Sequence, residues 1–138
     1  MRQSSLPPTA IVLSFIDRIN RGDVDGLSEL MTEDHHLVVL DEEPLVGRAA
    51  NVEAWRGYAS SYPRYVIHPR LIAGEGNRVA VLGTTTGSHL GLPDADERRL
   101  AVIWVAEVIG QALQSWRIEE DSQESRDRLG LRLTTAFL

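Results

Sequence analysis

The chain has 138 residues, of which 43% are hydrophobic and 25% are charged, and its formal net charge is −6. This composition is typical of a globular domain that buries its own core without a metal or a disulfide. An acidic chain without a clustered basic stripe argues against a nucleic-acid partner. The sequence predicts one domain over residues 1–138, with a core over about 8–121 and a tail over 122–138.

Cysteine and lysine are both absent, and all 14 basic residues are arginine. These absences exclude a thiol nucleophile, a thiolate metal site and a lysine Schiff base. His35 and His36 are adjacent in a predicted strand and so point to opposite faces, which makes them a poor metal pair. We therefore expect no metal site and no cofactor.

The first apolar run, residues 11–16, is too short to cross a bilayer and is followed by Asp17 and Arg18. No basic leader with a cleavage site precedes it. The sequence therefore predicts a cytoplasmic protein with no membrane partner.

Three helices are predicted in the first half of the chain. The first is expected to begin with Thr9 as its N-cap and to end at Gly22. Asp23 is expected to cap a second, short helix. The third helix is predicted over residues 48–62. A short hairpin is predicted between the second helix and the third.

The rest of the chain reads mostly as strand. Long strands are predicted over residues 65–73, 78–90, 98–109 and 112–121. Residues 91–97 are predicted as a loop, and the tail is predicted to be partly helical. Helices followed by a run of antiparallel strands indicate an α+β protein with the helices on one face of a sheet.

The strand predicted over residues 98–109 is apolar on both faces. Alternate residues from Leu100 to Val108 form one face, and those from Ala101 to Ile109 form the other with a single glutamate. An antiparallel strand of this kind must be covered on both sides. The helices cover one side, so the tail or a second subunit must cover the other. We expect a homodimer through the sheet.

This order of elements resembles the ketosteroid-isomerase-like, nuclear-transport-factor-type cone fold. The phrases NRGDVDGLSELMTED, VGRAANVEAW, YPRY and GQALQSWRIEED are similar to recurring phrases of that superfamily. Within it, GTTTGSHLG looks closest to the SnoaL-like (polyketide cyclase) branch. The resemblance implies a cone-shaped α+β barrel, with three N-terminal helices packed on a curved, mostly antiparallel sheet around an apolar pocket. The superfamily includes isomerases, cyclases, hydratases, epoxide hydrolases and many proteins that are not enzymes.

The catalytic groups of the superfamily do not carry over to this chain. Phe15 stands where an isomerase of this fold has its tyrosine, and Val39 stands where the isomerase has its base. The cyclase histidine falls at Thr85. The acid of an epoxide hydrolase falls at Ile118, two residues after Trp116. A dienolate mechanism needs both a base and an oxyanion donor, so we reject a ketosteroid-isomerase mechanism.

His89 is the candidate proton carrier that the sequence retains. In a regular strand it would share a face with Thr85 and lie nearer the mouth of the cone. Neutral histidine both donates and accepts a hydrogen bond. Glu120 or Asp121 is the candidate acid–base partner, because an apolar pocket would raise the pKa of either carboxyl. The alternatives are a strand-end histidine in solvent and an acidic strand end at the rim.

Aromatic side chains are the candidate ligand contacts. Trp55, Tyr58 and Tyr62 fall on or near the inner stripe of the third helix and are suited to stacking on a flat ligand, although they also fit an ordinary core. The predicted ligand-binding set is completed by Thr85, Phe15 and Trp116.

Two functions therefore follow from the sequence. The first is a small-molecule-binding protein with an apolar conical pocket. The alternative is a cyclase- or isomerase-type enzyme that uses His89 with Glu120 or Asp121 as acid and base. A fold alone does not decide between them.

Overall fold

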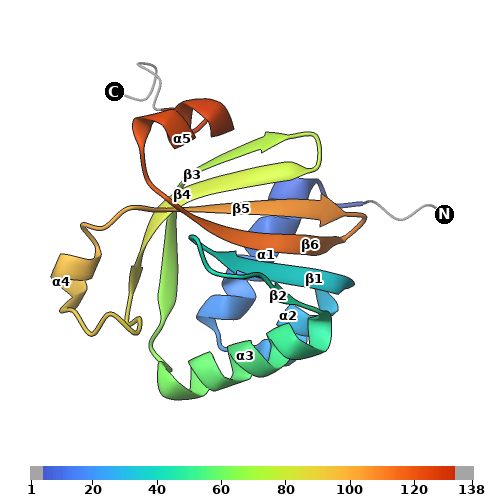
Figure 1. Cartoon of the computed structure of the whole chain (residues 1–138), viewed down its shortest axis with the longest axis horizontal. Coiled ribbons are helices and arrows are strands. Elements are labelled where there is room, and N and C mark those ends of the chain that lie inside the picture. Colours follow the sequence, from blue (N-terminus) through green and yellow to red (C-terminus); the bar gives the residue numbers. More distant parts are fainter. Residues whose placement is uncertain (1–4, 133–138) are drawn as a thin grey trace.

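The computed structural model describes residues 5–132 of the chain. Over these residues, helices pack on a curved sheet (Figure 1). The elements in chain order are α1 (Pro8–Asn20), α2 (Val24–Glu29), β1 (Met31–Val39), β2 (Leu45–Val46), α3 (Arg48–Ser61), β3 (Val66–Glu75), β4 (Arg78–Thr86), α4 (Asp94–Glu97), β5 (Val102–Ile109), β6 (Ala112–Glu120) and α5 (Gln123–Leu129). The predicted α+β class is confirmed, and α5 confirms the helix expected in the tail, whereas α4 lies in the segment predicted as a loop.

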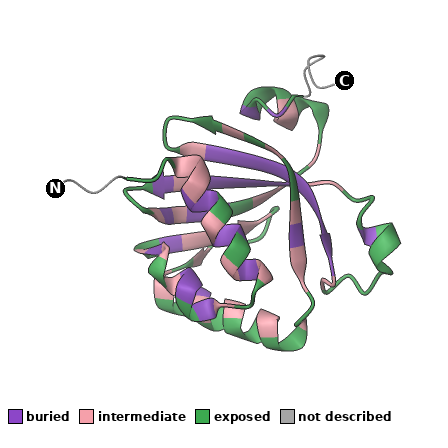
Figure 2. Ribbon diagram, turned by 180° about the vertical axis from the view of Figure 1, so that it is seen from behind, coloured by how far each residue is buried: buried purple, intermediate pink, exposed green. Residues whose placement is uncertain are grey.

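The sheet has six strands in the order β2-β1-β6-β5-β4-β3 and does not close on itself. β1 runs parallel to β6, and the other neighbouring strands are antiparallel. The mostly antiparallel, curved sheet that the resemblance implied is therefore confirmed. α1 crosses the concave face of the sheet, and α3 packs against α2 and β1 (Figures 1 and 2).

The start of α1 differs from the sequence prediction. Pro7 is the N-cap, in an extended conformation, and Pro8 is the first helical residue. Proline suits this position because its fixed φ matches the first turn and its missing N–H has no helical partner there. The predicted Thr9 N-cap is therefore wrong by two residues.

The passage from α1 to α2 follows the sequence prediction. Gly22 has a φ of 66°, in the left-handed region that favours glycine. Asp23 then caps α2, because its side chain accepts a hydrogen bond of 2.9 Å from the backbone N–H of Gly26.

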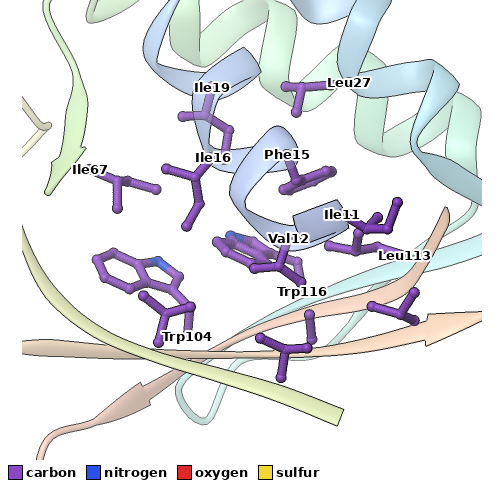
Figure 3. Close-up of a cluster of buried hydrophobic side chains, with 14 of the residues drawn as sticks. Ile11, Val12, Phe15, Ile16, Ile19, Leu27, Ile67, Trp104, Leu113 and Trp116 are labelled. Atoms are coloured by element: carbon purple, nitrogen blue, oxygen red, sulfur yellow. The ribbon is translucent and has the colours of Figure 1, made fainter. Parts of the chain in front are cut away.

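The main core lies between α1 and the concave face of the sheet (Figure 3). The Phe15 ring of α1 lies 5.1 Å from the ring of Trp116, which in turn stacks on Trp104 at 6.3 Å between ring centroids. Each of the two tryptophans is only 1% exposed. The inward stripe of α1 consists of Ile11, Val12, Phe15, Ile16 and Ile19.

The opposite face of the sheet carries a smaller apolar cluster, which the end of the described chain covers. Leu129 of α5 and Leu131 join Leu82, Ile103 and Val105 in this cluster. Ile103 is 0% exposed and Val105 is 6% exposed. The sequence analysis expected either the tail or a second subunit to cover this face of the sheet, and the tail covers part of it. The homodimer stays a prediction.

β4 ends at Thr86 and not at Leu90, so the predicted strand position of His89 is wrong. The strand stops because the next residue, Gly87, has a φ of 70°, and an added Cβ there would clash with the backbone oxygen of Arg64. His89 consequently lies in the turn after β4. Strand alternation no longer fixes its direction, and its neighbours must do so.

Candidate functional site

A cavity of about 200 Å³ opens beside α3 at one end of the concave face. Its wall combines side chains of β1, α3 and β6 with one residue before β3 and one after β4. The lining residues are Leu37, Val39, Ala54, Trp55, Tyr58, Tyr65, His89 and Ile118. No carboxylate is among them, so the pocket is an apolar surface with a few hydrogen-bonding groups at fixed points.

Val39 and Ile118 are paired directly across β1 and β6. They are the two positions at which the resemblance places the base of an isomerase and the acid of an epoxide hydrolase. Both line the pocket, so the two positions lie on a common wall. In this chain that wall is aliphatic, and it can exclude water but cannot move a proton.

His89 and Tyr58 form the polar point of the pocket. His89 Nδ1 lies 2.8 Å from the hydroxyl oxygen of Tyr58, and the backbone N–H of His89 donates to the same oxygen at 3.2 Å. Burial raises the pKa of the Tyr58 hydroxyl, opposed by hydrogen bonds from the His89 backbone and the Ser88 side chain. Tyr58 is therefore a neutral phenol at physiological pH.

Glu97 is a buried carboxylate that sequence reasoning missed. It is the last residue of α4 and only 1% exposed. Its carboxylate accepts hydrogen bonds from the Thr85 hydroxyl and from the backbone N–H of Ser88. Burial opposes ionisation, but hydrogen bonds from Thr85 and Ser88, helped by nearby His89, hold the pKa of the carboxyl below its usual value.

The position of Glu97 explains how the turn after β4 is held. The carboxylate joins the end of α4 to the last residues of β4, and His89 lies in the segment between them. The sequence offered little indication of this, because the run DADE at residues 94–97 looks like a solvated acidic loop. The one available signal was the row of threonine hydroxyls at the end of β4, which can donate hydrogen bonds to a nearby carboxylate.

The two acids expected to partner His89 lie outside the pocket lining. Glu120 is two residues beyond Ile118, so it shares that face of β6, but it is exposed at the strand end. Asp121 instead binds Arg126 through two hydrogen bonds of 2.7 and 2.8 Å, which lower the pKa of its carboxyl. The structure therefore does not bring either acid together with His89.

The predicted aromatic contacts divide between the cavity and the core. Trp55 and Tyr58 line the pocket, and Tyr62 lines an adjoining cavity of about 240 Å³ that shares both of them. The remaining predicted contacts are instead packed inside the protein: Phe15, Trp116 and Thr85. The two aromatic rings of this group are buried because α1 lies across that end of the concave face (Figure 3).

Two classes of feature are missing from residues 5–132. Within this range, no three histidine or acidic side chains gather as a metal site would require. No helix in the same range is both long enough and apolar enough to cross a membrane.

Solved structures with the same fold include enzymes and proteins of unknown function. SalBIII, an epoxide hydrolase/cyclase-like enzyme of pyran ring formation in the polyether salinomycin, is 25% identical, with a TM-score of 0.65 over 81% of this chain and 88% of its own. A candidate polyketide cyclase from Sinorhizobium meliloti is 22% identical, with a TM-score of 0.66 over 82% and 94%. An NTF2-like protein of unknown function from Cytophaga hutchinsonii is 12% identical, with a TM-score of 0.69 over 90% and 98%.

These likenesses confirm the cone fold that the resemblance implied. No curated protein matches the chain significantly in sequence. The sequence profile of the SnoaL-like domain family, however, matches residues 12–116, which span α1 to β6 and include most of the pocket wall. The chain therefore belongs to the SnoaL-like domain family.

Proposed function

We propose that this protein binds a small, apolar, ring-containing molecule in the pocket beside α3. The observation that carries the proposal is the aliphatic pair of Val39 and Ile118 on the pocket wall. Where the enzymes of this fold carry acids, this chain has side chains that gain free energy only by excluding water from an apolar partner. Trp55 adds an aromatic face suited to a flat ring.

The size of the cavity limits the ligand. An apolar protein cavity of about 150 Å³ holds one benzene molecule. The pocket has about 200 Å³, so it suits one substituted ring or two fused rings. A longer ligand would have to extend into the adjoining cavity. Trp55, Tyr58 and Tyr65 line both cavities and stand between them.

An acid–base enzyme is the second candidate function. It is favoured by His89, which lines the pocket with its ring held by Tyr58, and by Glu120, which lies on the pocket face of β6 beyond Ile118. Similarity to SalBIII, an epoxide hydrolase/cyclase-like enzyme, points in the same direction. Such an enzyme would use His89 as its proton carrier, with Glu120 or Asp121 recruited when the ligand is bound.

Binding is tested with tetralin, a two-ring hydrocarbon, by following backbone amide shifts of the ¹⁵N-labelled protein. We expect saturable shifts at residues around the pocket. Ala54→Phe would fill the cavity and should weaken binding at least tenfold, whereas Ala50→Phe places the same ring on an exposed site of α3 outside the lining. Equal binding by both variants, or no binding by the wild type, would refute the proposal.

Catalysis is tested separately with 1-tetralone, the ketone of the same skeleton. An acid–base enzyme should speed the exchange of its α-hydrogens for deuterium in D₂O, and His89→Gln should remove most of that acceleration. A binding protein should leave the exchange at its buffer rate. Acceleration that depends on His89 would replace the first candidate function with the second.

A further inference from the structure

The hydroxyl of Tyr58 determines which nitrogen of His89 carries the proton. A backbone N–H can only donate, so the Tyr58 oxygen must accept the hydrogen bond from the His89 backbone. The phenol keeps its own proton to give, and His89 Nδ1 lies 2.8 Å away. A phenol is a stronger hydrogen-bond donor than acceptor, and the unprotonated nitrogen of an imidazole is a strong acceptor. Nδ1 is therefore the acceptor.

The neutral imidazole consequently carries its proton on Nε2. A histidine whose Nδ1 accepts a hydrogen bond has only the Nε2–H group left to donate. Within the described residues, no protein group accepts a hydrogen bond from Nε2 of His89, whose exposed ring lines the pocket. The side chain thus offers a ligand a donor that would otherwise bind only water.

The turn that carries His89 is held from three directions. Gly87 turns the chain where any side chain would strike the backbone of Arg64. Glu97 fixes the neighbouring Ser88 from α4, and Tyr58 binds both the backbone and the ring of His89 from α3. A donor held in this way loses little conformational entropy when it binds a ligand, and so contributes more to selectivity.

Apart from His89 and Tyr58, the polar group that the wall offers is the hydroxyl of Tyr65, which keeps its proton because burial raises its pKa and which can both donate and accept. The indole N–H of Trp55 is buried without a partner and is not open to the cavity. No carboxylate lines the cavity to accept a hydrogen bond from a ligand. The wall therefore favours a ligand with an acceptor over a ligand with a donor.

We infer that His89 is the ligand-recognition residue of this pocket, that Tyr58 positions it as the Nε2–H tautomer, and that the pocket selects apolar ring molecules carrying an acceptor oxygen, such as a ketone, over hydrocarbons of the same shape. The inference rests on the proposed function, because it concerns the ligand of the same pocket. It does not require the protein to be an enzyme.

The tautomer is tested by ¹⁵N NMR of the histidine rings at pH 8. His89 should show a protonated Nε2 and an unprotonated Nδ1, with its signals assigned by their loss in His89→Gln. His35 provides the reference within the same spectrum, because its Nδ1 donates to the carbonyl oxygen of Leu113 and should be the protonated nitrogen. Tyr58→Phe should shift His89 towards a mixture of tautomers and leave His35 unchanged. An Nδ1–H tautomer of His89 in the wild type would overturn the inference.

Selectivity is tested with the matched pair tetralin and 1-tetralone. The wild type should bind the ketone about threefold to tenfold more tightly than the hydrocarbon, as one hydrogen bond to a neutral group allows. His89→Leu should abolish this preference while tetralin still binds, and His89→Gln, which keeps an N–H donor, should retain part of it. The measured quantity is the ratio of the two affinities. A general change in the pocket would alter both affinities alike and leave this ratio unchanged.

The possible outcomes separate the two claims. If tetralin binds and the ketone has no advantage, or if His89→Leu keeps the advantage, the inference is overturned and the proposed function stands. If neither compound binds the wild type, the proposed function fails, and the inference fails with it.

Discussion

The two ends of the concave face of the sheet contain similar side chains in different settings. At the closed end, under α1, Trp104 and Trp116 stack with their rings buried (Figure 3). At the open end, beside the C-terminal end of α1, half-buried Trp55 lines two cavities. The same residue type therefore supports the fold at one end and surrounds free volume at the other. Whether an aromatic side chain belongs to the core or to a binding site depends on what covers it.

The same substitution at the two ends should show this difference most strongly. Trp104→Ala would leave a large cavity in packed surroundings, and we expect it to lower the free energy of unfolding by about 3–5 kcal/mol. Trp55→Ala would enlarge cavities that already exist, so it should cost about half as much or less. Urea unfolding followed by circular dichroism measures both values.

Binding provides the opposite readout for the same pair of variants. Trp55→Ala should weaken tetralin binding, whereas Trp104→Ala, where it folds, should bind tetralin nearly as the wild type does. Equal costs in stability at the two positions would show that the open end is packed as tightly as the closed end. The proposed pocket would then lose its physical basis.

The turn after β4 belongs to the open end and depends on one glycine. Gly87 and Gly91 both have a positive φ, of 70° and 68°, but only at Gly87 would a Cβ meet backbone atoms. Gly91→Ala should therefore cost about 1 kcal/mol for the left-handed conformation alone. Gly87→Ala should cost at least twice that, and it should also shift the NMR signals of His89. If the two variants lowered the free energy of unfolding by similar amounts, the turn could accommodate a Cβ at Gly87 without strain.

Most of the fold could be predicted from the sequence, because helix caps and apolar periodicity are local signals. Asp23 caps α2 as expected, and Gly22 follows α1 in the left-handed conformation as expected. The second face of β5 was also recognised as needing cover. Its cover came from α5, a segment whose short apolar pattern is weak in the sequence. The homodimer that this face suggested is tested by sedimentation, which should give twice the chain mass.

The candidate site could be predicted only in part, because it depends on contacts between distant segments. His89 was correctly singled out, but its place in a strand was wrong, since one glycine ends β4 earlier than the threonine pattern suggests. Tyr58 and His89 are 31 residues apart, and no local pattern pairs them. Glu97 was missed for the same reason. Its burial follows from how α4 folds back on Thr85.

Glu97 allows a test of whether the turn at the open end is held by charge. Its carboxylate accepts two hydrogen bonds in a buried position, so Glu97→Gln should cost about 1–3 kcal/mol at pH 7. Glu53→Gln, on the exposed surface of α3, is the control and should be near neutral.

The pH dependence of the Glu97 contribution has a definite sign. Folding lowers the pKa of this carboxyl, so as the pH falls the unfolded chain takes up the proton before the folded protein does. The stabilisation is therefore complete above the ordinary value of 4.5 and is lost as the pH falls through the lower folded value. The stabilities of wild type and Glu97→Gln should therefore approach each other as the pH falls below 4.5. A difference that did not shrink below that pH would show that the charge is not what holds the turn.

The smallest expected effect belongs to the closed end, where His35 is 0% exposed beside Phe15. Burial lowers the pKa of its imidazole below 6.5. As the pH falls, the unfolded chain is therefore protonated at this histidine before the folded protein is. The stability of the fold is therefore full above the ordinary pKa and falls with pH below it, by at most about 1 kcal/mol between pH 6.5 and 5.5. His35→Gln keeps a donor for the Leu113 carbonyl but does not titrate, so its unfolding free energy should stay flat over this interval. Urea unfolding at pH 7.5, 6.5 and 5.5 tests the difference. An unfolding free energy of His35→Gln that fell with pH as steeply as that of the wild type would refute the assignment of the slope to His35.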